Sequence, residues 1–380
     1  MEAVTFVKML HQSLSQSSER HILRIAHAAD YYRIAKAIKE TKGVYKQLKS
    51  VEPLPLIRAF SYHGKLPPSF TKKFPNLLSI EDDIPITVHA IPSIGTAPVS
   101  AAESFKRPFV PYGIRKLRVP SVWKRSLGER VRIGVIDTGV DYNHPDLQQV
   151  LSRGINLLNP RTLPLDDNGH GTHIAGTIAA TGRNAMTGIA PRATIFPVKA
   201  FDHNGSAYVS DIIKGIDWCV QNKVHIINMS FGMKRRSQAM LEAVRNARKN
   251  GVIIVASSGN DGKEAVDYPA RFRQTISVGA IGRTGDVAPF SNRGKRIDVY
   301  APGEKIMSTW PNYRYREMTG TSMATAHVTG ILALVLSVRP RMSPLQIKKL
   351  VAAGQLPLSG KIKRARGPGR IDAIRVFRQI

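Results

Sequence analysis

Apolar and polar stretches alternate along the later part of the chain. From residue 112 onward, short apolar runs rich in β-branched residues are followed by segments with helical spacing of apolar residues. This alternation is typical of a parallel sheet with helices on both faces. We therefore predict an α/β domain over residues 112–380, with strands at 131–137, 194–200, 224–229, 251–257, 275–281 and 297–300.

The earlier part of the chain has a different, smaller pattern. Residues 21–89 are predicted to form a small α+β unit, preceded by an N-terminal extension over residues 1–20. Pro, Ser, Ala and Gly dominate residues 90–111, as is typical of an exposed linker. Within the small unit we predict strands at 21–26, 44–51, 56–62 and 77–81 and helices at 29–41 and 67–73.

Three stretches place reactive side chains at the ends of predicted elements. Asp137 ends an apolar strand, His170 opens a small-residue helix, and Ser322 follows a tight Gly-Thr turn at the start of an apolar helix. A carboxylate, an imidazole and a hydroxyl are the groups used in nucleophilic catalysis. Taken singly, each has a structural alternative: a solvated strand end, a packed core histidine and a helix N-cap.

Together, in the order Asp, His, Ser, these stretches resemble the subtilisin family of serine proteases. The resemblance covers about residues 112–338, and Ala326 departs from it where the family usually has proline. It implies a subtilisin-like fold and a serine endopeptidase in which Asp137, His170 and Ser322 are catalytic and the Asn260 amide binds the oxyanion. The matching signatures are Asp137-Thr138-Gly139, His170-Gly171-Thr172-His173 and Gly320-Thr321-Ser322-Met323-Ala324.

The resemblance also implies a substrate cleft with two backbone edges. An extended peptide between them would form main-chain hydrogen bonds on both sides. The alternative is that both edges are ordinary loops. The residues implied for substrate binding are Gly205, Ser206 and Ala207 on one edge, Ser230, Phe231 and Gly232 on the other, and Ser257, Ser258 and Gly259 beside Asn260.

Asp267 has a specific place in this alignment. Matched on Tyr268-Pro269, it falls at the base of the first specificity pocket, where the family often has glycine. A desolvated carboxylate there would favour Lys or Arg before the scissile bond, because an unpaired buried charge is costly. The alternative is a side chain turned outward to solvent.

The small N-terminal unit resembles the ferredoxin-like propeptide of this family. Its acidic end, Glu81-Asp82-Asp83, leads into an extended tail, as in such propeptides. A propeptide of this kind would lay its tail in the cleft, so we expect the chain's own propeptide to be its inhibitor. Self-cleavage is predicted between Ile84 and Lys106, near His89 and Ala90. The alternative is an interaction domain that the mature protein keeps.

The family resemblance implies structural calcium and no cofactor for the chemistry. Asp146 matches the family's calcium-ligand aspartate, and the loop at residues 181–187 matches the calcium loop, with Thr181 and Asn184 as the further candidate ligands. This loop is one residue shorter than in the secreted enzymes and has no carboxylate, whereas a hard cation needs six or more oxygens.

Composition adds a strong positive charge, +29. Weak polyanion binding is one consequence, with the basic cluster at residues 361–370 as its candidate, and a solvated surface without a partner is the alternative. A polyanion-binding or regulatory protein on a subtilase scaffold is therefore the rival to an endopeptidase acting on polypeptides.

Other features set outer limits on the protein. The single cysteine, Cys219, excludes an internal disulfide and is expected to pack as a small hydrophobe. Lys8 interrupts the apolar stretch near the start, so no secretory signal is predicted, and the protein is expected in the cytoplasm or exported by another route. We also expect a monomer without a membrane-spanning apolar run.

Overall fold

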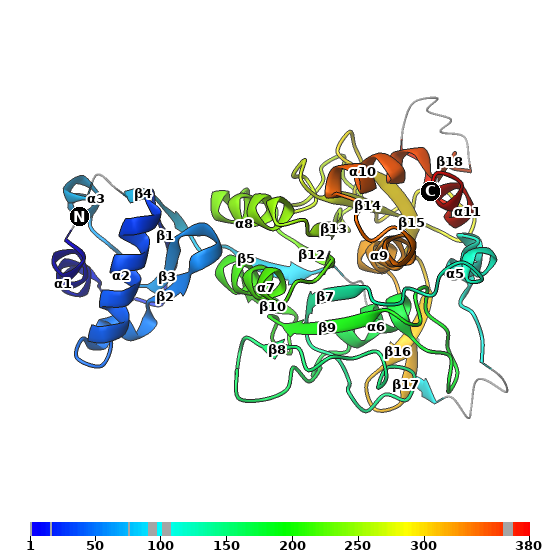
Figure 1. Ribbon diagram of the computed structural model, residues 1–380, viewed down its shortest axis with the longest axis horizontal. Helices are drawn as coiled ribbons and strands as arrows, with labels where there is room; N and C mark the ends of the chain where they lie inside the picture. Colours follow the sequence, from blue (N-terminus) through cyan, green and yellow to red (C-terminus); the bar gives the residue numbers. More distant parts are fainter. Residues whose placement is uncertain (1, 16, 75–76, 90–96, 101–107, 360–367) are drawn as a thin grey trace.

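The computed structural model describes all residues except 1, 16, 75–76, 90–96, 101–107 and 360–367. In the described part, a small N-terminal domain, blue in Figure 1, lies against one side of a larger α/β domain. The helices α7 (Val209–Gln221) and α8 (Gln238–Lys249) of the larger domain face the smaller one (Figure 1).

The N-terminal domain is a four-stranded antiparallel sheet with helices on one face. Its strand order, β2-β3-β1-β4, together with the βαββαβ chain order, is the ferredoxin-like arrangement. In β1, Leu23 turns into the domain's own core, whereas Ile22 packs into the core of the larger domain. The elements are α1 (Ala3–Ser13), β1 (Arg20–Ile25), α2 (Ala28–Thr41), η1 (Lys46–Ser50), β2 (Glu52–Leu54), η2 (Pro55–Ile57), β3 (Ala59–His63), α3 (Pro68–Lys73) and β4 (Leu77–Asp82).

Two sequence-based expectations for this domain are wrong. Residues 1–20 are not a separate extension, because α1 buries Phe6 and Leu10 in the domain's core. The strand predicted at 44–51 is replaced by the 3₁₀ helix η1. Leu48 and Val51, the two buried apolar residues of this segment, are three positions apart, a spacing that places both on one side of a helix.

The larger domain is built on a nine-stranded sheet in the order β18-β19-β15-β14-β13-β11-β7-β9-β8. All neighbouring pairs are parallel except β18 and β19. Each of the six predicted strands has a counterpart here, which confirms the α/β prediction. The strands are β7 (Arg132–Asp137), β8 (Ile155–Asn156), β9 (Thr194–Lys199), β11 (Ile226–Met229), β13 (Ile253–Ser257), β14 (Ile276–Ile281), β15 (Val299–Pro302), β18 (Gln355–Leu356) and β19 (Arg370–Ile371).

Helices cover both faces of this sheet. Along β7, Ile133 and Val135 join the core that contains α6 and α9, while Ile136 joins the core of α7 and α8. The remaining helices are α5 (Tyr112–Lys116), η3 (Val119–Val122), α6 (His170–Ala179), α9 (Thr321–Val338), α10 (Pro344–Ala353) and α11 (Ala373–Arg378).

Short strands complete the larger domain in two three-stranded sheets. One has the order β10-β5-β12, in which β5 directly follows the N-terminal domain in the chain and its two neighbours belong to the larger domain. The strands are β5 (Pro85–Val88), β10 (Ser206–Tyr208) and β12 (Phe231–Gly232) in that sheet, and β6 (Val99–Ser100), β16 (Ile306–Trp310) and β17 (Arg314–Met318) in the other.

The sequence analysis predicted no apolar run long enough to span a membrane, and the central helix α9 is an exception to that prediction. Among the described residues it is long and apolar enough, by length and composition, to cross a membrane. However, 89% of it is buried inside the protein. Its apolar surface is therefore used in the core, against α6 and strands β11, β13 and β14.

Two buried histidines are expected to make the fold sensitive to acid. Burial lowers the pKa of His173 to about 3 and that of His327 to about 4. Below about pH 6.5 the unfolded chain binds protons that the folded chain does not, so stability falls as the pH drops toward 4. Each histidine contributes a slope of about 1.4 kcal/mol per pH unit.

Urea unfolding of a Ser322→Ala protein between pH 7 and pH 5 measures this slope. His327→Gln should lower the slope by the contribution of that one histidine, whereas His63→Gln, at an exposed position, should leave the slope unchanged. Equal slopes in all three proteins would contradict the assignment.

Candidate active site

Asp137 and His170 form a hydrogen-bonded pair at the carboxyl edge of the large sheet. Asp137 ends β7, and its Oδ1 lies 2.7 Å from His170 Nδ1 at the first residue of α6. Gly171 makes this approach sterically feasible, because a Cβ there would lie 2.1 Å from the Gly139 carbonyl oxygen. Both side chains are buried. Since the carboxylate accepts the Nδ1 proton, Nε2 is left as the basic nitrogen.

Ser322 lies in the first turn of α9, and its hydroxyl faces a backbone carbonyl of the chain's own N-terminal part. Ser322 Oγ is 2.6 Å from the carbonyl oxygen of His89 and 2.9 Å from that of Ser230. In the described part of the chain, His170 Nε2 has no hydrogen-bond partner. The structure thus joins Asp137 to His170 directly, whereas the Ser322 hydroxyl is turned toward His89.

The segments expected as cleft edges lie on either side of β5. Ser206 and Ala207 of β10 pair with Thr87 and Ile86, and Phe231 and Gly232 of β12 pair with Val88 and Thr87. At the end of the strand, Val88 N donates to Gly205 O and His89 N to Ser230 O, at 3.1 and 3.0 Å. An extended segment is therefore held by main-chain bonds on both sides, ending at the residue whose carbonyl meets Ser322.

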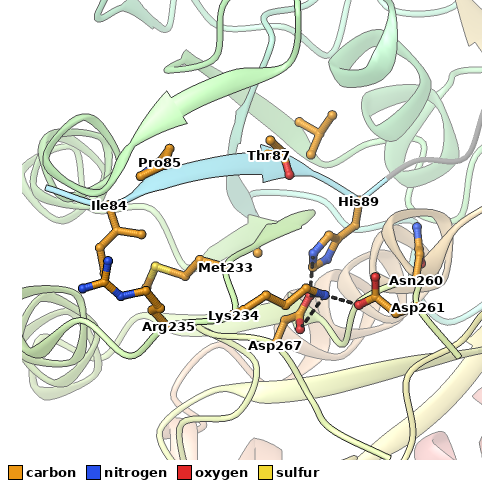
Figure 2. Close-up of a pocket in the computed structure, with 12 residues that line it drawn as sticks. Ile84, Pro85, Thr87, His89, Met233, Lys234, Arg235, Asn260, Asp261 and Asp267 are labelled. Atoms are coloured by element: carbon orange, nitrogen blue, oxygen red, sulfur yellow. Dashed lines mark hydrogen bonds and ion pairs between the residues drawn. The ribbon is translucent and has the colours of Figure 1, made fainter. Parts of the chain in front are cut away.

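The His89 side chain points into a pocket beneath this strand (Figure 2). Its Nδ1 lies 2.8 Å from Ser257 Oγ, and its Nε2 lies 3.1 Å from Asp267 Oδ2. Gly232 leaves room for the ring, because a Cβ at that position would be 2.2 Å from His89 Cε1. Asp267 is buried in this pocket, so the alternative of a side chain turned to solvent does not hold.

Asn260 is oriented by the start of α9. Its Oδ1 accepts hydrogen bonds from Thr321 N and Thr321 Oγ1, both at 2.9 Å. This fixes which side of the amide carries the oxygen and leaves the NH₂ group on the other side as a donor. Ser258 and Gly259 have a supporting position, since Ser258 Oγ donates to Asn292 O and Gly259 N to Thr321 Oγ1.

Sequence reasoning missed Lys234. Its Nζ lies 2.9 Å from Asp267 Oδ2 and also pairs with Asp261 (Figure 2). In the sequence it opens the run Lys234-Arg235-Arg236, which by itself indicates only an exposed charged loop. Its pairing with Asp267 depends on two segments that meet only in the fold.

The candidate calcium residues do not fit a calcium site of the expected kind. Asp146 Oδ1 accepts from Asn184 N at 2.8 Å, and Oδ2 accepts from Ala185 N, Met186 N and Tyr315 Oη at 3.1, 2.9 and 2.7 Å. Four protein donors thus take the lone pairs that a cation would need. No group of three or more His, Cys, Asp or Glu suited to a metal occurs among the described residues. The surroundings of Asp146 therefore do not fit the role of calcium ligand that the resemblance implied for it.

We expect this loop to be insensitive to calcium. A chelator should leave the Tm of the Ser322→Ala protein unchanged, whereas Asp146→Ala should cost about 3–5 kcal/mol, because it leaves buried donors unpaired. Thermal unfolding with and without chelator measures both. A chelator effect on the Tm that disappears in Asp146→Asn would contradict this reading.

The chain has clear relatives among known proteins. Residues 128–362 match the model of the subtilase family. The chain is 42% identical over 240 residues to the major intracellular serine protease of Bacillus subtilis, covering 60% of this chain and 75% of that protein. It is 34% identical over 319 residues to a thermostable alkaline protease of Halalkalibacterium halodurans (83% and 82% covered) and 40% identical over 246 residues to subtilisin E of Bacillus subtilis (63% and 64%). The chain therefore belongs to the subtilase family and is a serine endopeptidase of the subtilisin type.

Proposed function

We propose that this endopeptidase hydrolyses polypeptides through Asp137, His170 and Ser322, and that it is made as a precursor that cuts itself between His89 and Ala90. The observation that carries the proposal is the Ser322 hydroxyl, 2.6 Å from the carbonyl oxygen of His89, at the end of a strand bound along the cleft. The proposed nucleophile therefore lies beside the peptide carbonyl that it would attack.

The proposed chemistry is acyl transfer. The Ser322 hydroxyl turns from the carbonyl oxygens toward His170 Nε2, gives up its proton there and attacks the peptide carbon. Asp137 holds the imidazole in the tautomer that leaves Nε2 free and offsets the charge that forms on the ring. The Asn260 amide and the Ser322 backbone N–H donate to the developing oxyanion. His170 then protonates the leaving amine, and water repeats the sequence on the acyl-enzyme.

The N-terminal domain is proposed to inhibit the enzyme by occupying its cleft. Its acidic end supports this role, because it caps two helices that flank the cleft. Glu81 accepts from Ser237 Oγ, Gln238 N and Ala239 N at the start of α8, and Asp83 accepts from Ser210 N and Oγ in the first turn of α7. An ion pair between Arg24 and Glu242 adds a further contact between the two domains. Carboxylates at helix N-termini are favourable because unpaired N–H groups and the helix dipole meet them.

The alternative of a polyanion-binding protein rests on the net charge alone, and no described residue adds to it. The basic cluster at residues 361–370 lies mostly outside the described residues, as does most of the predicted linker between 90 and 107. The scissile bond we propose joins the last described residue of the N-terminal segment, His89, to that linker.

Labelling with a fluorophosphonate and mapping the new N-terminus together test the proposal. We expect the label on Ser322 and a polypeptide that begins at Ala90. His170→Ala should abolish both the label and the cut, because the serine then lacks its base. Labelling of another serine, or an unchanged label in His170→Ala, would refute the assignment.

A further inference from the structure

The pocket that holds the His89 side chain is charged. Asp267 lies at its base with only 5% of its side chain exposed, and it faces both the imidazole of His89 and the ammonium of Lys234. Lys234 Nζ lies 2.9 and 3.1 Å from the two Asp267 oxygens and also pairs with Asp261 (Figure 2). Two carboxylates and one ammonium therefore meet where the side chain before the scissile bond is bound.

Asp267 has no cation of its own in this pocket, because Lys234 is shared between Asp261 and Asp267. Arg235, which also lines the cavity, pairs with Asp82, and Lys263 acts on Asp261. A cationic side chain would give Asp267 a buried partner, whereas an apolar one would further desolvate the carboxylate without adding one, which is costly. A cavity of about 380 Å³ runs along β5 and is lined at one end by His89, Lys234, Asp261 and Asp267, so the pocket is continuous with open space.

Lys234 differs from Asp267 in its exposure. The lysine side chain is 60% exposed, whereas the carboxylate is buried. An exposed ammonium gains little from an ion pair and loses little when it returns to water. A substrate cation that enters the pocket can therefore take its place on Asp267 at small cost.

Resting on the proposed function, we infer that the first specificity pocket selects cationic side chains, namely lysine, arginine and protonated histidine, and that Lys234 is a counter-ion that competes with them for Asp267. The pocket thus prefers basic side chains, and the protein's own Lys234 weakens that preference.

The test uses the self-processed enzyme and a series of peptides that differ only in Arg, Lys, His, Phe or Leu before the scissile bond. The wild-type kcat/KM should be higher for Arg and Lys than for Phe by about 10-fold or more. Asp267→Asn should lower kcat/KM for Arg by about 100-fold without lowering that for Phe. Lys234→Met should raise the Arg-to-Phe ratio about 10-fold, because a like charge is removed from beside the substrate cation.

Two further comparisons make the test specific. Arg236→Met removes a charge from the same loop without touching the pocket and should leave the ratio unchanged. For the His peptide, kcat/KM relative to Arg should fall as the pH rises from about 5.5 to 7.5, because the imidazole loses its proton.

The outcomes separate this inference from the proposed function. A wild-type preference for Phe or Leu, or a fall in the Arg-to-Phe ratio in Lys234→Met, would overturn the inference while peptides are still cut. If Asp267→Asn does not fold, the Lys234→Met result decides. Failure of the proposed function would instead appear as no cleavage of any peptide and no label on Ser322.

Discussion

Replacing Ser322 by alanine is expected to leave the chain uncut and to lower kcat on peptides about 10⁶-fold, the loss known for this change in subtilisin itself. The hydroxyl is the group that meets the His89 carbonyl, and alanine supplies no nucleophile in its place. Mass spectrometry of the purified chain measures the cut, and a chromogenic peptide measures kcat.

The fold should be unaffected by this substitution, since the oxygen it removes donates, within the described part of the chain, to two cleft carbonyls. Ser121→Ala, at an exposed serine of η3, is the matched control and should process normally. Cleavage of the Ser322→Ala chain at the His89–Ala90 bond at the wild-type rate, with no other protease present, would contradict the role of Ser322.

Replacing Glu81 by alanine should weaken inhibition by the N-terminal domain about 30- to 150-fold, equivalent to about 2–3 kcal/mol. Glu81 accepts three hydrogen bonds at the N-terminus of α8, each to a charged acceptor. Their loss weakens the complex and leaves the enzyme's own core intact. The dissociation constant follows from the activity that the self-cut complex regains on dilution.

The adjacent carboxylates provide controls for Glu81. Asp82 pairs with Arg235 where both side chains are exposed, so Asp82→Ala should change the dissociation constant less than about fivefold. Asp83→Ala should also weaken inhibition, because it leaves Ser210 and Arg20 without their buried acceptor. A larger effect from Asp82→Ala than from Glu81→Ala would refute the proposed capping role.

The three residues proposed for catalysis could be picked out from the sequence because each lies in a local signature. Asp137 follows an apolar strand, and His170 and Ser322 each begin a helix of small residues, so short segments determine the backbone that presents them. Apolar runs rich in β-branched residues likewise predicted the large sheet, because strands covered by helices on both faces are apolar along nearly their whole length. In the N-terminal domain the same reasoning failed at η1, where few apolar residues gave a weak pattern.

Other properties depended on which groups the fold brings together. The residue type of Asp146 is compatible with a metal, yet the backbone of residues 184–186 and Tyr315, far along the chain, use its oxygens. From the sequence, Lys234 is only a surface charge and His89 only the last residue of the N-terminal unit, and the fold places both side chains on Asp267. Sequence by itself therefore determined the chemical groups and the elements that carry them, whereas the tertiary structure decided which partner each group has. Covalent neighbours set backbone conformation over a few residues, but hydrogen bonds and ion pairs between distant segments exist only once the chain is packed.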